Sequence, residues 1–161
     1  MAVACLLTSF QILLIRRERI RALGDLAAAL RLLQGELSLR GESLPRLFET
    51  IAGRCSGVGR ELFEAVSRES GRLGEERFER IWRECVDGVA CILRQQERER
   101  LGRVGEVLGH VELDLQLQVL EETTTALRLE MEQEEARLPE ERRLYLGLGA
   151  AAAATLGIVL L

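Results

Sequence analysis

Lysine is absent from this sequence of 161 residues, histidine occurs once, and aromatic residues make up only 4% of the chain. Proline occurs only at Pro45 and Pro139. Leucine, alanine, glutamate and arginine dominate instead, and this composition is typical of helices that pack through aliphatic side chains. No segment alternates apolar and polar residues for long enough to predict a β-strand. The predicted fold class is therefore all-α.

Reactive side chains are also scarce. His110 is the only histidine, so the sequence offers no Ser/His or Cys/His catalytic set. The GxxxxGK[ST] phosphate-binding loop is also missing. The cysteines Cys5, Cys55, Cys85 and Cys91 contain no CxxC pair, so the usual spacing of zinc ligands is absent. We therefore expect that the protein is not an enzyme and binds neither a cofactor nor a metal. The alternative is a metal-dependent enzyme whose site lies on an acidic helix face.

The charge pattern argues against a nucleic-acid partner. All 22 basic residues are arginine, and 26 acidic residues give a net charge of -4. Arginine and glutamate alternate along the predicted helix faces and form no basic stripe, whereas binding to a phosphate backbone needs one.

Long uncharged segments occur at the two ends of the chain. Residues 1–15 carry no charge and stop abruptly at "RRERIR". A membrane-spanning helix needs about 20 apolar residues, so we predict that this short N-terminal membrane segment spans only with tilting or bilayer thinning. The alternatives are an amphipathic or buried first helix, or a start codon placed too far downstream.

The C-terminal segment, residues 144–161, is uncharged throughout and rich in leucine and alanine. It is predicted to be a transmembrane helix, because a helix that is apolar all round is hard to bury in a domain of this size. A hydrophobic hairpin buried in the domain is the alternative. The side chains predicted to face lipid are Leu144, Leu146, Leu148, Leu156, Ile158 and Leu160.

The flanks of these two segments predict how the chain lies across a membrane. Arginines follow the first segment and precede the second, at Arg16, Arg17, Arg19, Arg21, Arg142 and Arg143. Both clusters border the same intervening domain, residues 16–143. By the positive-inside rule that domain faces the cytoplasm and both termini lie on the far side.

The domain itself is predicted to be a bundle of about six antiparallel helices. Leucines at Leu23, Leu26, Leu30, Leu33 and Leu37 recur at spacings of three and four, and a second seam comprises Leu113, Leu117, Leu120, Thr124, Leu127 and Met131. Between them, Ser43 and Pro45 predict a helix start whose buried face is Leu44, Leu47, Phe48 and Ile51.

Three further features complete the helix assignment. Gly41 and Gly109 are predicted to end helices. One helix is predicted to bury Phe78, Ile81, Trp82, Cys85, Val89 and Ile92. Pro139 is predicted to interrupt the last helix of the domain just before the uncharged tail.

An acidic run near the end of the domain comprises Glu130, Glu132, Glu134 and Glu135. It could hold a cation or meet a basic partner, but a solvated helix face explains it more simply. The residues predicted to bind a partner are Gln116, Gln118, Glu130 and Glu134.

The stretch "DLAAALRLLQGELSLRGESLPRLFETIA", residues 25–52, resembles the opening of the stage III sporulation protein AB family. In that family a helix ends at a glycine and a Ser/Thr-Pro-Leu-type turn leads into the next helix. A helix with a tryptophan follows, here around Trp82, then a Leu-Gly turn, here Leu108 and Gly109. A long helix with glutamines, here Gln116 and Gln118, and an apolar C-terminal segment complete the order.

This resemblance implies a membrane-anchored helical domain similar to the cytoplasmic domain of the platform protein of type II secretion machines. It implies a non-enzymatic component of a sporulation channel between mother cell and forespore, in the mother-cell membrane that surrounds the forespore. The implied partners are a cytoplasmic ATPase, other channel subunits and the membrane, with possible self-association. The alternative is a soluble or peripheral adaptor that dimerises through the two heptad seams.

Overall fold

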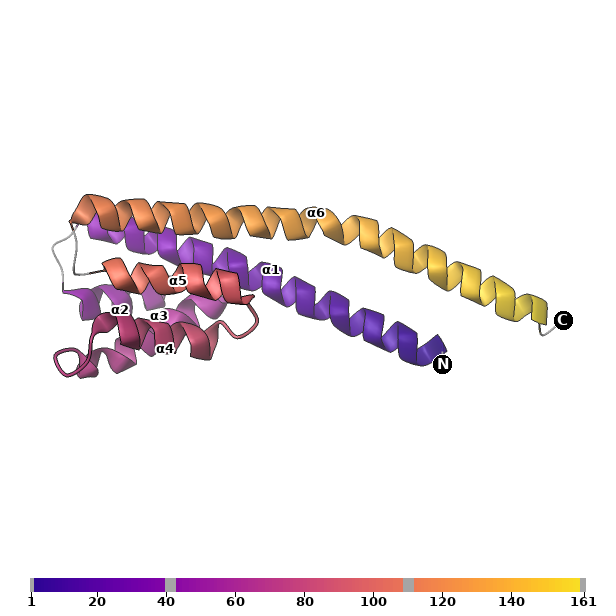
Figure 1. Cartoon of the computed structure of the whole chain (residues 1–161), viewed down its shortest axis with the longest axis horizontal. Helices are drawn as coiled ribbons and strands as arrows, with labels where there is room; N and C mark the ends of the chain where they lie inside the picture. The colour runs from indigo at the N-terminus through magenta and orange to yellow at the C-terminus, as the bar shows by residue number, and fades with distance from the viewer. Residues whose placement is uncertain (1, 40–42, 109–111, 160–161) are drawn as a thin grey trace.

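The computed structural model describes residues 2–39, 43–108 and 112–159, and the side chains within residues 14–38, 43–108 and 112–137. These residues contain six α-helices, a 3₁₀ turn and no named β-strand. The two long helices, α1 (Ala2–Leu39) and α6 (Leu113–Val159), lie side by side and run antiparallel (Figure 1). The predicted all-α fold of about six helices is confirmed for the described residues.

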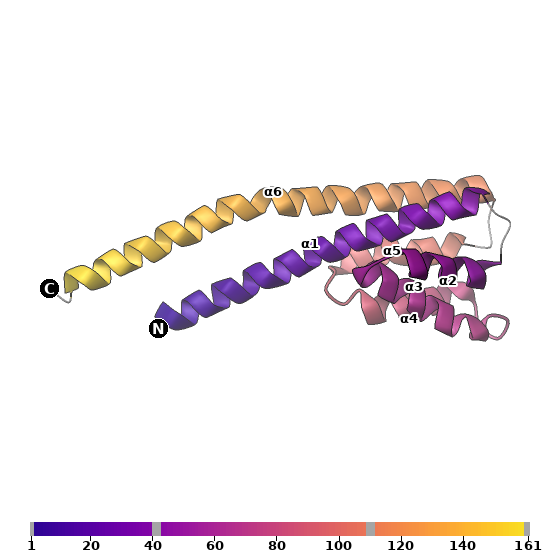
Figure 2. The same cartoon turned by 180° about the vertical axis from the view of Figure 1, so that it is seen from behind.

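Four short helices pack against one end of this helix pair (Figures 1 and 2). They are α2 (Leu44–Arg54), α3 (Gly57–Glu69), α4 (Phe78–Val89) and α5 (Gln95–Val107), with the 3₁₀ turn η1 (Ser70–Arg72) between α3 and α4. We call residues 19–137 the head. The two arms, residues 2–18 of α1 and 138–159 of α6, extend beyond the short helices at the same end of the molecule.

The head's core is aliphatic around an aromatic centre. Leu23, Leu26, Leu30 and Leu33 of α1 are 0% exposed, as are Leu120 and Leu127 of α6. The few aromatic residues gather in one place, because Phe48, Phe63 and Phe78 each have ring centroids within 6.4 Å of that of Trp82. The Trp82 indole N–H donates a hydrogen bond to the Leu101 carbonyl at 2.7 Å, which satisfies its polar atom inside the core.

Two glycines allow helices to approach closely. A Cβ at Gly59 of α3 would lie 2.6 Å from the Asp25 carbonyl oxygen of α1. A Cβ at Gly105 of α5 would lie 2.5 Å from Cδ1 of Trp82 in α4. Both distances are far below van der Waals contact, so any larger residue forces these helix pairs apart.

The first seam and the start of α2 agree with the predictions from sequence. Ser43 is the N-cap residue, Pro45 lies in the first turn, and Leu47, Phe48 and Ile51 are buried, with Leu44 half-buried. Gly41 and Gly109, predicted to end helices, lie outside the described residues.

Three local predictions were wrong. Leu113 is 44% exposed, and Gln116 takes the buried position at the start of α6. Ile92 lies in the turn after α4, which ends at Val89. Pro139 lies inside α6 and does not end it; a proline removes one helical hydrogen bond and can bend a helix without stopping it.

Each uncharged end belongs to a helix that continues from the head. The described part of residues 1–15 is the beginning of α1, and residues 144–159 are the end of α6. Among the described residues, the helices include no apolar segment of the length that a membrane crossing requires. The side chains of Leu144, Leu146, Leu148, Leu156 and Ile158, and all of Leu160, lie outside the described residues.

Candidate interaction surfaces

A cluster of buried charges joins α1, α5 and α6 where the arms leave the head. The Arg19 guanidinium of α1 contacts the Glu97 carboxylate of α5 and lies 3.1 Å from Glu134 Oε1 of α6. The exposed fractions of these side chains are 9% for Arg19, 0% for Glu97 and 7% for Glu134. We call Arg19, Glu97, Glu130 and Glu134 the junction cluster.

Neighbouring groups satisfy the remaining polar atoms of this cluster. Arg94 donates its backbone N–H to Glu97 Oε2 at 2.7 Å and its guanidinium to Glu134 Oε1 at 2.9 Å. Arg100 donates to Glu130 Oε1 at 2.8 Å. Such full pairing is what makes buried charge tolerable, since an unpaired one costs several kcal/mol.

The carboxyl groups of the cluster titrate differently. Burial opposes ionisation of Glu97, but hydrogen bonds from Glu130 and Arg19 outweigh it and lower the pKa of Glu97. The pKa of Glu130 is raised to about 7, because its carboxyl group shares a hydrogen bond with Glu97 and is partly buried beside that negative charge. Near neutral pH Glu130 is therefore partly protonated, and the protonated form can donate a hydrogen bond to Glu97.

The sequence does contain a signal for this cluster: charged residues occupy seam positions, which the spacing of apolar residues alone does not reveal. Arg19 is in register with the leucine seam of α1, four residues before Leu23. Glu97 is likewise four residues before the buried Leu101 of α5, and Glu134 continues the buried face of α6. A charge at a seam position on each of three helices predicts mutual pairing, although no single helix shows which partner it meets.

The cluster corrects two predictions. Glu130 and Glu134 were predicted to lie on a solvated face, but Glu134 is buried and Glu130 half-buried in ion pairs, whereas Glu132 and Glu135 are exposed. Arg19 was counted with the arginines that flank the first membrane segment, but it is buried in the head.

The four residues predicted to bind a partner therefore lie in different surroundings. Gln118 is exposed on the outer face of α6, while Gln116 and Glu134 are buried and Glu130 is half-buried. The structure brings Glu130 and Glu134 together through Arg19, from which they lie 3.9 Å and 3.1 Å away, and Gln118 is separate. A role for them in binding a partner stays a prediction.

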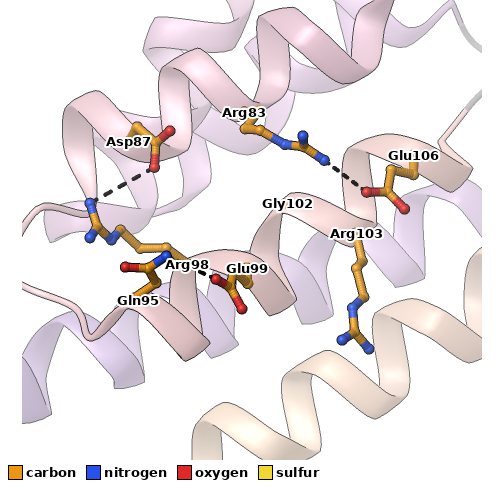
Figure 3. A pocket seen from close by; sticks show the side chains of 8 residues that line it. All are labelled: Arg83, Asp87, Gln95, Arg98, Glu99, Gly102, Arg103 and Glu106. Carbon is orange, nitrogen blue, oxygen red and sulfur yellow. Dashed lines mark hydrogen bonds and ion pairs between the residues drawn. The ribbon is translucent and has the colours of Figure 1, made fainter.

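A charged groove of about 510 Å³ runs between α4 and α5 (Figure 3). Its walls are tied by two ion pairs, Arg83 to Glu106 at 2.8 Å and Arg98 to Asp87 at 3.8 Å. Arg103 points away from these pairs in Figure 3 and is exposed. The groove presents both signs of charge to solvent, an arrangement that confers specificity on protein contacts.

Reactive groups show no catalytic arrangement within the described part of the chain. No group of three or more His, Cys, Asp or Glu side chains there could hold a metal ion. Cys85 is buried and Cys55 half-buried, and burial raises the pKa of both thiols, while Cys91 is exposed on the turn between α4 and α5. Cys5 and His110 lie outside the described side chains.

Most residues of the two seams considered as dimer interfaces belong to the core of the head, whereas Leu113 at the start of the second seam is exposed. The leucines from Leu23 to Leu33 and Leu120 and Leu127 are fully buried within one chain. An adaptor that dimerises through these seams would have to open its own core.

The fold and these surfaces define an all-α protein with a compact head and two helical arms that project together. The chain belongs to the stage III sporulation protein AB family, whose model matches residues 1–161. The solved structure "Stage III sporulation protein AB (SpoIIIAB)" is similar to it, with a TM-score of 0.66 and 25% sequence identity over 75% of this chain and 96% of that one. No curated protein matches the sequence significantly. The resemblance predicted from the sequence is thus confirmed, and the chain is a sporulation protein.

Proposed function

We propose that this chain is a non-enzymatic, membrane-anchored component of a secretion-like channel complex between mother cell and forespore. In this proposal it is a platform that docks an ATPase and other subunits on the cytoplasmic face of the mother-cell membrane around the forespore. The arms are the anchors, and the head is the docking body.

The observation that carries the proposal is the shared direction of the arms. Both uncharged ends continue helices of the head and project from the same end of it (Figures 1 and 2). Two anchors placed in this way can enter one membrane surface together. The part of α6 from residue 144 to Val159 is about 24 Å long, against the roughly 30 Å of a bilayer's hydrocarbon core, a difference that bilayer thinning can close.

Arginines at the start of each arm support the cytoplasmic orientation. Arg17 and Arg21 are exposed on α1, and Arg142 and Arg143 precede the uncharged tail. Arg19 is not counted among these flanking arginines, because it is paired with Glu97 inside the head. The remaining arginines still border the head side of both uncharged segments, as the positive-inside rule expects of a cytoplasmic domain.

The docking part of the proposal rests on the charged groove between α4 and α5. The pair of Arg83 with Glu106 is exposed and that of Arg98 with Asp87 is partly exposed, so each is worth little to the head's stability and can be exchanged for contacts to a partner.

The test uses the native thiol Cys91, which is exposed on the head. In a chain with Cys5→Ser and Cys55→Ser, with a new cysteine added after residue 161, intact vegetative cells that express the chain, in which the far side of the membrane is open to the medium, are treated with a membrane-impermeant maleimide. Cys85 stays, because it is buried. We expect labelling beyond residue 161 and protection of Cys91 until the cells are permeabilised. The same chain with Cys91→Ser shows which part of the labelling comes from Cys91 and which from the added cysteine.

Labelling of Cys91 in intact cells would place the head outside the cytoplasm and contradict the orientation. A chain recovered wholly in the soluble fraction without detergent would contradict the anchors.

A further inference from the structure

The outer face of α6 carries a line of side chains with coiled-coil spacing. Leu115, Gln118, Glu122, Thr125 and Leu129 follow one another at intervals of three, four, three and four residues. All five are exposed, and Leu115 and Leu129 have 44% and 53% of their surface in solvent. Residues at this spacing form one continuous stripe along a helix. We call this line the α6 outer stripe.

The stripe is separate from the face that α6 uses in the head. The buried residues of α6 are Gln116, Leu120, Thr123, Thr124, Leu127 and Glu134. They lie on the opposite side of the helix, toward α1 and α5. No part of the chain within the described ranges covers the stripe, so its leucines are available to another molecule.

The stripe borders a shallow hollow of about 510 Å³ between turns of α6. The hollow is lined by Gln118, Glu121, Glu122, Thr125, Ala126 and Leu129. Leu115 lies at the other end of the stripe, about 21 Å from Leu129 along the helix axis. This length matches four turns of a helix laid alongside α6.

The charges around the stripe select the partner. Three exposed carboxylates border it, at Asp114, Glu121 and Glu132, and a fourth, Glu122, belongs to it, against one exposed arginine, Arg128. None of these four is in an ion pair among the described residues. In paired helices the charges beside the apolar line choose the partner, so acidic flanks call for basic ones.

A second copy fits this face poorly. Antiparallel pairing of two stripes about their centre would set Glu122 against Glu122 and bring the flanking carboxylates together. Like charges in such a contact disfavour it.

We propose that the α6 outer stripe is a docking surface for a basic amphipathic helix of another protein subunit. Leu115 and Leu129 contact the apolar line of that helix, and Glu121 and Glu122 pair with its flanking arginines or lysines. The inference deepens the docking role proposed above and rests on it for the existence of a subunit partner.

Binding of synthetic helices to the purified full-length chain, in a non-ionic detergent, tests the proposal. The probe is a fluorescein-labelled peptide of about 21 residues with leucine at the heptad a and d positions and lysine at e and g. One control peptide has glutamate in place of lysine, and another is a scrambled sequence of the lysine peptide. Fluorescence anisotropy measures each Kd at low and physiological salt.

Of the three peptides, we expect only the heptad lysine peptide to bind, and its Kd should rise with the salt concentration. The double variant Glu121→Lys/Glu122→Lys should weaken binding about tenfold or more, and Leu129→Ser should weaken it by a similar factor. Glu49→Lys, at an exposed position on α2, is the matched control and should leave the Kd unchanged.

Three outcomes would overturn the proposal. They are the absence of binding by the lysine peptide, equal binding of the scrambled peptide, and equal weakening by Glu49→Lys. A dimer in sedimentation velocity that Leu129→Ser dissociates would make a second copy the occupant instead. The result does not depend on membrane orientation, so the cysteine-labelling test can fail or succeed independently.

Discussion

Gly105 sets the distance between α4 and α5. Replacing it with alanine places a methyl group against the Trp82 indole, which is itself fixed by its hydrogen bond to Leu101. We expect Gly105→Ala to lower the free energy of unfolding by about 1 to 3 kcal/mol. Urea unfolding followed by the fluorescence of Trp82, the single tryptophan, measures this.

Gly35 is the matched control for this substitution. It lies within α1 and is exposed, and a methyl group added to its Cα would meet no atom within 4 Å, so alanine there only favours the helix. We expect Gly35→Ala to raise the free energy of unfolding by up to about 1 kcal/mol. If the two variants have equal stability, the close approach at Gly105 is not a constraint.

Arg19 neutralises two buried carboxylates at once. Arg19→Met keeps much of the side-chain volume but leaves Glu97 and Glu134 without their shared cation. We expect the free energy of unfolding to fall by about 3 kcal/mol at pH 7. Adding Glu97→Gln to Arg19→Met should restore part of this loss, because it removes the unpaired charge.

Arg60→Met on α3 breaks an exposed pair with Glu64 and serves as the control, with no measurable change expected. A loss for Arg60→Met as large as that for Arg19→Met would show that burial of the junction cluster is unimportant.

Glu130 makes the head's stability depend on pH. Its pKa in the folded chain is raised to about 7 by the neighbouring Glu97 carboxylate, above its value in an unfolded chain. The folded state therefore binds the proton more tightly, and the contribution of Glu130 is fully present below about pH 4.5 and lost as pH rises through about 7. Stability should thus decline across this window.

Glu130→Gln should flatten that decline in urea unfolding curves recorded at intervals between pH 5 and 8. Glu132→Gln, on the exposed side of α6, should leave it unchanged. Both variants retain His110, so any contribution it makes is common to the two. An unaltered slope in Glu130→Gln would contradict the shared proton.

At the scale of whole helices, apolar periodicity was enough to locate most of the head. The seam of α1 and the buried face of α2 follow directly from leucine spacing and from Ser43 and Pro45. Helix ends were harder, because Pro139 does not stop α6 and Ile92 falls in a turn after α4. The residue at which a helix ends depends on the backbone hydrogen bonds of its last turn, and these cannot be read from residue composition.

The junction cluster could be predicted from the sequence only in part, for a different reason. Its members come from three helices, and the ion pair from Arg19 to Glu97 spans 78 positions. Each charge alone resembles a solvated residue. Only the packing of α6 against α1, and of α5 against α6, turns three seam positions into one buried site.

For the molecule as a whole, the arms and the head should be separable. Among the described side chains, the buried apolar core of the head runs from Ile20 to Leu127. We expect a chain without residues 144–161 to keep the urea midpoint of the full chain, followed by Trp82 fluorescence, and to be extracted from membranes more easily, since only the shorter anchor in residues 1–15 remains. A large fall in the midpoint would instead favour the tail as a buried hairpin packed on the head.

The continuity of α6 makes the chain a lever. Its 47 residues span about 70 Å, and α5 and the junction cluster act near the point where the arm begins. A tilt of the arm by about 5° would move its far end by roughly 3 Å, given an arm of about 33 Å. We therefore expect a tilt imposed near Arg19 and Glu134 to displace the far end of the arm.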